Sequence, residues 1–235
     1  MIKEAIILAG GLGTRLRGVI RGIPKPMAPI GEKPFLAFLL DYLNFNGIKK
    51  IIISVGYKKE AIINYFGNSY KNSEIIYSEE HTPLGTGGAI LKAFKLVEGD
   101  ESFVLNGDTL FKIKLKDLYE FHKQKKADIS IALKDNDFKR KRYGNVLLSK
   151  EGRIIGFEEK RGGSAFINGG IYLLKGEVFE NSNFSERFSF EKDFLEKKIS
   201  EFRIFGKVFN DYFIDIGIPK DYERAKREIK KITRK

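Results

Sequence analysis

The chain has 235 residues, of which 42% are hydrophobic and 31% charged, as in globular proteins of one or two domains. It has no cysteine, which excludes disulfides, thiolate nucleophiles and cysteine-based zinc sites. Its two histidines, His81 and His122, leave little material for a Ser-His-Asp triad or a His-rich metal site. No stretch approaches the roughly 18 apolar residues that span a bilayer, and the apolar run near the N-terminus is too short for a signal peptide. We therefore expect a cytoplasmic protein.

The net charge of +12 raises the question of a polyanionic partner. The lysines are scattered along the whole chain, a pattern more typical of a solvated surface than of a nucleic-acid interface. The same positive field would favour phosphorylated small molecules. We expect small-molecule substrates, with neither a nucleic acid nor a membrane as partner.

The first half of the chain alternates predicted strands with predicted helices. Short apolar runs predict strands at residues 5–8, 51–55, 74–78 and 102–105, and helical spacing predicts helices at 35–43, 59–66 and 87–97. Such alternation is typical of βαβ units. It predicts an α/β fold with a Rossmann-like, mixed but mainly parallel sheet flanked by helices, in which ligands bind at the carboxyl ends of the strands.

The second half is richer in predicted strands. They fall at residues 128–133, 145–149, 153–158, 166–174 and 203–209, and helices are predicted at 115–125, 190–198 and from 219 onward. The sequence has no internal repeat and no Pro- or Ser-rich linker. We predict a single domain.

The strongest motif is a glycine-rich segment, Leu8-Ala-Gly-Gly-Leu-Gly-Thr-Arg-Leu16, followed by Pro24-Lys-Pro-Met27. The glycines allow a tight turn that brings backbone N–H groups close to an anion. Arg15 adds a planar, permanently charged donor, and the two prolines hold Lys25 on a stiff segment. The motif is neither a P-loop nor a Gly-x-Gly-x-x-Gly fingerprint. Glycines, arginine and lysine in this order nevertheless predict a cradle for a triphosphate.

Two aspartates in apolar surroundings suit a metal site. Asp108 ends the turn Asn106-Gly-Asp108 after a predicted buried strand, and Asp215 lies in Phe213-Ile-Asp-Ile-Gly217. A lone aspartate in such a place is more often a turn or cap residue. Two of them in a phosphate-binding protein suit Mg²⁺, which takes one or two carboxylates together with phosphate oxygens and water. The metal would neutralise charge while a phosphate oxygen attacks an α-phosphate and pyrophosphate leaves, which requires no protein nucleophile.

Together these motifs resemble the sugar-phosphate nucleotidyltransferase family. The resemblance extends from residue 8 to residue 222 and includes the Asn-Gly-Asp turn and Phe157-Glu-Glu-Lys160. The segments most similar to the branch that acts on D-glycero-α-D-manno-heptose 1-phosphate with GTP are residues 24–29, 83–88, 167–170 and 213–222. The resemblance implies one nucleotidyltransferase domain over residues 1–235. Its nucleotide-binding part would comprise about residues 1–110 and its sugar-phosphate-binding part about residues 111–235.

The resemblance also implies three sets of site residues. Those expected to bind the nucleotide are Leu8, Ala9, Gly10, Gly11, Gly13, Thr14, Arg15, Lys25, Glu80, Gly85, Thr86 and Asp108. Those expected to bind the sugar phosphate are Asn106, Gly144, Glu159, Lys160, Asn168 and Gly169. Arg15, Lys25 and Asp108 are expected to be catalytic, and Asp108 and Asp215 are expected to bind Mg²⁺.

Glu80 bears on the choice of base. Many thymidylyl- and uridylyltransferases of the family have a glutamine where Glu80 falls. A carboxylate accepts two hydrogen bonds and donates none, which suits the adjacent N1–H and N2–H₂ donors of guanine better than the single donor of uracil. Glu80 therefore favours GTP, with the alternative that Glu79 or Glu80 is simply a surface acid near a turn.

The sequence thus predicts an enzyme that transfers GMP from GTP to a heptose 1-phosphate with Mg²⁺. The alternatives within the class are mannose 1-phosphate with GTP and N-acetylmuramate 1-phosphate with UTP. A non-catalytic nucleotide-binding regulator is the alternative from another class, although such a protein would have no need of Arg15, Lys25, Asp108 and Asp215 together. A homo-oligomer is compatible with all of these interpretations.

Overall fold

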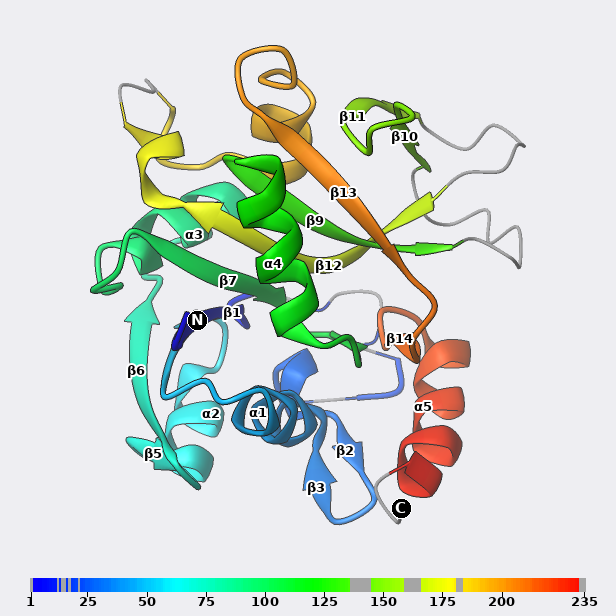
Figure 1. The fold of residues 1–235 in the computed structure, drawn as a ribbon. Coiled ribbons are helices and arrows are strands. Elements are labelled where there is room, and N and C mark those ends of the chain that lie inside the picture. The colour runs from blue at the N-terminus through cyan, green and yellow to red at the C-terminus, as the bar shows by residue number, and fades with distance from the viewer. Residues whose placement is uncertain are drawn as a thin grey trace.

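The computed structural model describes residues 2–11, 13, 16, 18–20, 22–135, 145–158, 166–180 and 184–232 (Figure 1). The predicted Thr14, Arg15, Gly144, Glu159 and Lys160 lie outside the described residues. Within these ranges, no helix combines the length and the apolar character that crossing a membrane requires.

In the described part of the chain the strands form one large mixed sheet and two small ones. The strands are β1 (Glu4–Leu8), β2 (Pro29–Ile30), β3 (Lys33–Pro34), β4 (Lys50–Val55), β5 (Ser69–Tyr70), β6 (Ser73–Glu79), β7 (Glu101–Asn106), β8 (Thr109–Phe111), β9 (Ile129–Asp135), β10 (Asn145–Leu148), β11 (Ile154–Glu158), β12 (Phe166–Lys175), β13 (Ile204–Phe209) and β14 (Phe213–Asp215). The helices are η2 (Lys25–Met27), α1 (Phe35–Phe45), α2 (Lys59–Phe66), α3 (Gly85–Phe94), α4 (Leu115–Lys125), η3 (Gly176–Phe179), η4 (Phe190–Leu195) and α5 (Pro219–Ile232). Every predicted element is present, with boundaries that differ by a few residues.

The first half of the large sheet is parallel, as predicted. Its order is β7-β1-β4-β6, and β1 pairs in parallel with both β4 and β7. The second half joins through β12, which is antiparallel to β7 and to β9, while β13 returns parallel to β9. The predicted mixed α/β sheet is therefore confirmed.

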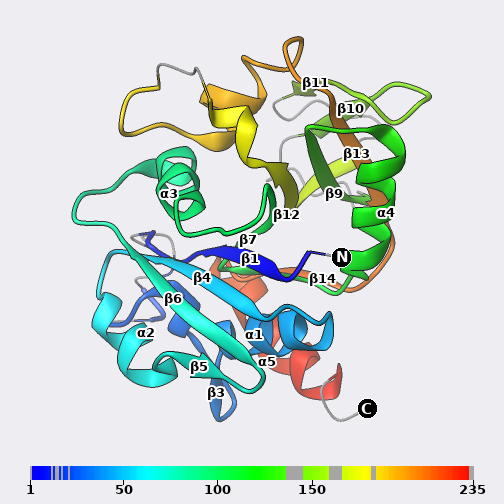
Figure 2. The same cartoon turned by 60° about the vertical axis from the view of Figure 1, so that its left-hand side comes forward.

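Alternate residues of the central strands enter two separate cores. Ile51 and Ile53 of β4 pack into one core and Ile52 into the other, and all three are fully buried, because successive strand side chains point to opposite faces. Helices α1, α2, α4 and α5 supply the first core, and α3, η3 and η4 supply the second. Figure 2 shows α3 on one side of β7, β1, β4 and β6, with α1 and α2 on the other.

Strand β12 changes partner at an irregularity. Its first residues, Phe166 and Ile167, pair with β10, whereas residues 171–175 pair with β7. The register with β9 shifts between Asn168 and Tyr172. Such bulges bend a strand and re-aim its side chains. This one brings the second half of the chain beside the end of β7.

Candidate active site

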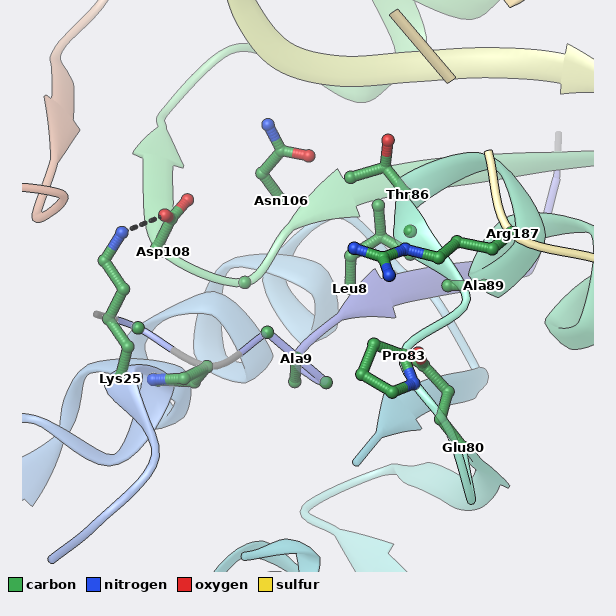
Figure 3. A pocket seen from close by; sticks show the side chains of 16 residues that line it. Leu8, Ala9, Lys25, Glu80, Pro83, Thr86, Ala89, Asn106, Asp108 and Arg187 are labelled. Carbon is green, nitrogen blue, oxygen red and sulfur yellow. Dashed lines mark hydrogen bonds and ion pairs between the residues drawn. The ribbon is translucent and has the colours of Figure 1, made fainter. Parts of the chain in front are cut away.

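A cavity of about 480 Å³ opens at the carboxyl ends of β1 and β7 (Figure 3), the expected ligand position in an open α/β sheet. The predicted residues that line it are Leu8, Ala9, Gly10, Gly11, Gly13, Lys25, Glu80, Gly85, Thr86, Asn106 and Asp108. Segments far apart in the sequence therefore meet around one pocket.

The glycine-rich loop leaves β1 and stays attached to its neighbours. The Ala9 N–H donates to the Ser54 carbonyl at 2.8 Å, and the Gly107 N–H donates to the Leu8 carbonyl at 2.9 Å. A Cβ atom on Gly10 would overlap the Glu80 carboxylate. The loop therefore lies against the end of β4 and the turn after β7, and a side chain at position 10 would displace the Glu80 carboxylate.

Lys25 and Asp108 form an ion pair at one end of the pocket (Figure 3). Lys25 begins the short helix η2 after Pro24, and the next residue, Pro26, is buried, so its backbone is fixed. Burial acts to raise the pKa of Asp108. The Lys25 ammonium and the Thr109 hydroxyl outweigh burial and hold the pKa of that carboxyl below its usual value. Asp108 is therefore an anion at neutral pH, with a cation beside it.

Asp108 and Asp215 lie on adjoining segments. Strand β14 runs antiparallel to β8 and places Asp215 opposite Thr109, and the Ile216 N–H donates to the Asp108 carbonyl at 2.9 Å. No cluster of three or more His, Cys, Asp or Glu residues suited to a metal occurs in the described part of the chain. Two carboxylates on adjoining segments are the kind of donors that Mg²⁺ takes together with phosphate oxygens and water.

The structure distinguishes Glu80 from Glu79. Glu80 lines the pocket, and its carboxylate accepts from the Ser54 hydroxyl at 2.8 Å and from the Leu84 N–H at 3.2 Å. Glu79 pairs instead with Lys59 at 2.5 Å, and this hydrogen-bonded ion pair lowers its pKa. The base-recognition hypothesis therefore concerns Glu80, whose carboxylate is held in place by two donors.

Thr86 in the first turn of α3 joins two walls of the pocket. Its hydroxyl donates to the Glu191 carboxylate and accepts from the Phe190 N–H, each at 2.8 Å. The Tyr172 hydroxyl donates to the other oxygen of Glu191 at 3.1 Å. One partly buried hydrogen-bond network around the Glu191 carboxylate therefore connects α3, η4 and β12.

The described sugar-phosphate candidates lie at the β12 irregularity and at the end of β7. Asn106 lines the pocket. The Asn168 amide donates to the Tyr172 hydroxyl at 2.8 Å, and its oxygen accepts from the Gly170 N–H at 2.9 Å. Gly169 faces the Phe111 ring, so its absent side chain serves close packing.

Several lining residues were not predicted from the sequence. They are Pro26, Pro83, Ala89, Gly107 and Arg187. Four of them lie within or next to the motifs. Arg187 does not, and nothing in Ser185-Glu-Arg-Phe188 marks it as a pocket residue. It reaches the pocket only because its segment packs against α3.

A model of the nucleotidyl transferase family matches residues 4–232. The chain belongs to this family. The predicted resemblance is therefore confirmed, and the glycine-rich loop and the Asn106-Gly-Asp108 turn lie in a nucleotidyl transferase domain.

The chain is similar over almost its whole length to several named proteins. It is 50% identical over 96% of its length to D-glycero-alpha-D-manno-heptose 1-phosphate guanylyltransferase of Aneurinibacillus thermoaerophilus, covering 98% of that protein. The Campylobacter jejuni protein of the same name is 48% identical, with 93% and 96% covered. The crystal structure of HddC from Yersinia pseudotuberculosis complexed with GMP-PN is similar with a TM-score of 0.87 and 38% identity, over 97% of this chain and 100% of that one.

Proposed function

We propose that this nucleotidyltransferase transfers GMP from GTP to D-glycero-α-D-manno-heptose 1-phosphate, forming GDP-heptose and pyrophosphate. The observation that carries the proposal is the near-full-length similarity, at 50% and 48% identity, to two proteins named for that reaction. The pocket supports it, because an ion pair of lysine and aspartate occupies one end and a carboxylate suited to guanine lines the wall.

In this proposal the nucleotide binds to the part formed by about residues 1–110. The glycine-rich loop offers backbone N–H groups to the phosphates, and Leu8, Ala9, Gly85 and Thr86 surround the base and ribose. The sugar phosphate binds to the part formed by about residues 111–235, together with Asn106. Lys160 would supply a point charge for the 1-phosphate, and Glu159 and Asn168 hydrogen bonds for sugar hydroxyls.

The reaction requires positioning and charge neutralisation rather than a protein nucleophile. An oxygen of the sugar 1-phosphate attacks the α-phosphorus of GTP in line, a P–O bond forms, and the bond between that phosphorus and the β-phosphate oxygen breaks. Lys25 and Arg15 stabilise negative charge on the α-phosphate and on the leaving pyrophosphate. Mg²⁺ held by Asp108 and Asp215 would supply further charge neutralisation when bound.

The Glu80 carboxylate would select the base. The Ser54 hydroxyl and the Leu84 N–H orient it and leave its remaining lone pairs for the N1–H and N2–H₂ groups of guanine. Uracil presents one donor between two acceptors, so one or both of its carbonyls would face a carboxylate. GTP is therefore favoured over UTP.

The proposal is tested by pyrophosphate release from the purified protein with Mg²⁺. GTP, ATP, CTP, UTP and dTTP are each combined with the 1-phosphates of the heptose, of mannose and of N-acetylmuramate. We expect release with GTP and the heptose phosphate above all. Release with mannose 1-phosphate would overturn the sugar assignment, and release with UTP would overturn the base assignment. Tight GTP binding without turnover on any sugar would favour a regulator.

A further inference from the structure

Arg187 brings a charged side chain into the pocket that the proposed reaction does not yet use. It lines the same cavity as Glu80 and Thr86, and Figure 3 shows its guanidinium directed into the space between Thr86 and Pro83. Among the residues that the structure describes, none forms an ion pair or a hydrogen bond with that guanidinium. Arg187 is exposed at the rim of the cavity, so its guanidinium is free to donate hydrogen bonds to a molecule bound there.

The segment that bears Arg187 is fixed to the start of α3. The Phe188 N–H donates to the Leu84 carbonyl, and the Gly87 N–H donates to the Phe188 carbonyl, each at 3.0 Å. Cβ atoms on Gly87 and Gly88 would overlap the Phe188 ring and the Glu186 carbonyl. Because these glycines let the two backbones touch, the position of Arg187 along the pocket wall is set by the fold.

Arg187 lies toward the base end of the pocket. In Figure 3 it shares one side with Pro83 and Ala89, while Lys25 and Asp108 lie at the opposite side. The phosphates already have Lys25 and the N–H groups of the glycine-rich loop there. A second cation at the other end therefore suits acceptor atoms of the base better than phosphate.

Guanine has the acceptors that such a cation needs. Its N1–H and N2–H₂ donors would face Glu80, which leaves the adjacent O6 and N7 as an acceptor pair. A guanidinium donates to O6 and N7 together, the commonest specific contact between arginine and guanine. Glu80 and Arg187, both described, form no ion pair with each other, so both charges are available to a base.

We propose that Arg187 is a specificity-determining residue that donates hydrogen bonds to O6 and N7 of guanine, opposite the donor edge held by Glu80. The inference rests on the proposed function, because it takes GTP as the nucleotide. It predicts that recognition depends on N7, an atom that Glu80 does not contact. Adenine would be rejected because its N6 amino group would point a donor at the guanidinium.

The test compares GTP with 7-deaza-GTP, in which a C–H group replaces N7. Binding of each nucleotide to the whole protein is measured by titration calorimetry with Mg²⁺ and without sugar phosphate, so that no turnover occurs. Arg187→Met keeps the length of the side chain and removes its donors. Glu186→Gln changes the neighbouring residue, which is exposed and outside the pocket lining, as the matched control.

We expect the wild type and Glu186→Gln to bind 7-deaza-GTP about tenfold more weakly than GTP. Arg187→Met should bind GTP about ten- to hundredfold more weakly, and its two affinities should agree within about twofold. An Arg187→Met protein that keeps the full preference for GTP over 7-deaza-GTP would overturn the proposal, and so would one that binds GTP normally. A wild type with no preference for GTP over UTP and ATP would instead refute the proposed function.

Discussion

Asp108 and Asp215 lie on adjoining segments because two three-residue strands pair across more than a hundred residues of sequence. We predict that Asp108→Ala and Asp215→Ala each reduce Mg²⁺-dependent turnover by at least about a thousandfold, since each removes a carboxylate that would hold the metal, and the metal would neutralise charge at the phosphates. Pyrophosphate release at saturating GTP measures the effect. Asp100→Ala, on an exposed loop, should retain wild-type turnover. Near-normal kcat in either variant would remove that aspartate from the proposed metal site.

The neighbouring acids Glu79 and Glu80 offer a matched pair for testing base selection. Glu80→Gln puts an amide donor where guanine needs an acceptor. We predict that the ratio of kcat/KM for GTP to that for UTP falls by a factor equivalent to about 1–3 kcal/mol of transition-state binding. Glu79→Gln weakens only the pair with Lys59 and should leave the ratio unchanged. An equal effect of the two substitutions would mean that the base is recognised elsewhere.

At the scale of elements, the start of α3 serves as a docking surface for residues 186–190. Gly87→Ala would force the Phe188 ring to move. We predict a loss of about 1–3 kcal/mol in the free energy of unfolding, as for other overpacked sites, and weaker GTP binding because Arg187 and Thr86 shift together. Urea denaturation and calorimetry measure the two effects. Gly18→Ala, where a Cβ meets nothing within 4 Å, is the control. Unchanged stability in Gly87→Ala would show that the segment adapts freely.

Elements with a strong local signal could be predicted from the sequence, and those defined by distant contacts could not. The run Ile51-Ile-Ile-Ser-Val55 is apolar on both faces because β4 is buried on both, so its pattern alone indicates a strand. Strands β8 and β14 are too short for any period, and only their mutual pairing defines them. The helix predicted at 190–198 is a π-helix that ends at Leu195, a hydrogen-bond pattern that periodicity does not distinguish.

The candidate site follows the same rule. Lys25 and Asp108 could be predicted because each lies in a motif whose residue order is itself informative. Arg187 and Glu191 could not, because the contacts of their segment with α3 give them their places. The sequence therefore predicts the site residues that lie in motifs, including Asn168 and Asp215 of the second half, whereas tertiary packing alone supplies Arg187 and Glu191.

At the scale of the whole molecule, the two halves share β12 as a common strand. Its last residues pair with β7 of the parallel half, and its first residues pair with β10. The change of partner occurs at residues 168–170, and Gly170 lies against Asn106 of the pocket. A sugar phosphate bound beside this irregularity would therefore contact both halves. The proposed reaction centre thus lies where β12 connects the two halves of the sheet.

Stability of the whole molecule should depend on pH through His122. Its side chain is 1% exposed, and Nδ1 lies 2.8 Å from the Ser130 hydroxyl of β9. No described residue forms a hydrogen bond with Nε2, and the Glu101 carboxylate is 3.6 Å away. Burial lowers the pKa of His122 from 6.5 to about 4, although the Glu101 carboxylate opposes the shift. The neutral imidazole is thus the form that the native packing accepts.

Because the pKa of His122 is lower in the folded state, the unfolded chain takes up a proton first as the pH falls. Its contribution to stability is complete above about pH 6.5 and is lost as the pH falls toward about 4. We predict a loss of about 2 kcal/mol between pH 7 and pH 5 from this residue, measured by urea denaturation at each pH. His122→Asn should be less stable at pH 7 and should lose less stability on acidification, whereas exposed His81→Asn should follow the wild type. If His122→Asn and the wild type lost equal free energy between the two pH values, proton uptake by His122 would have no part in acid unfolding, and the carboxylates would account for it.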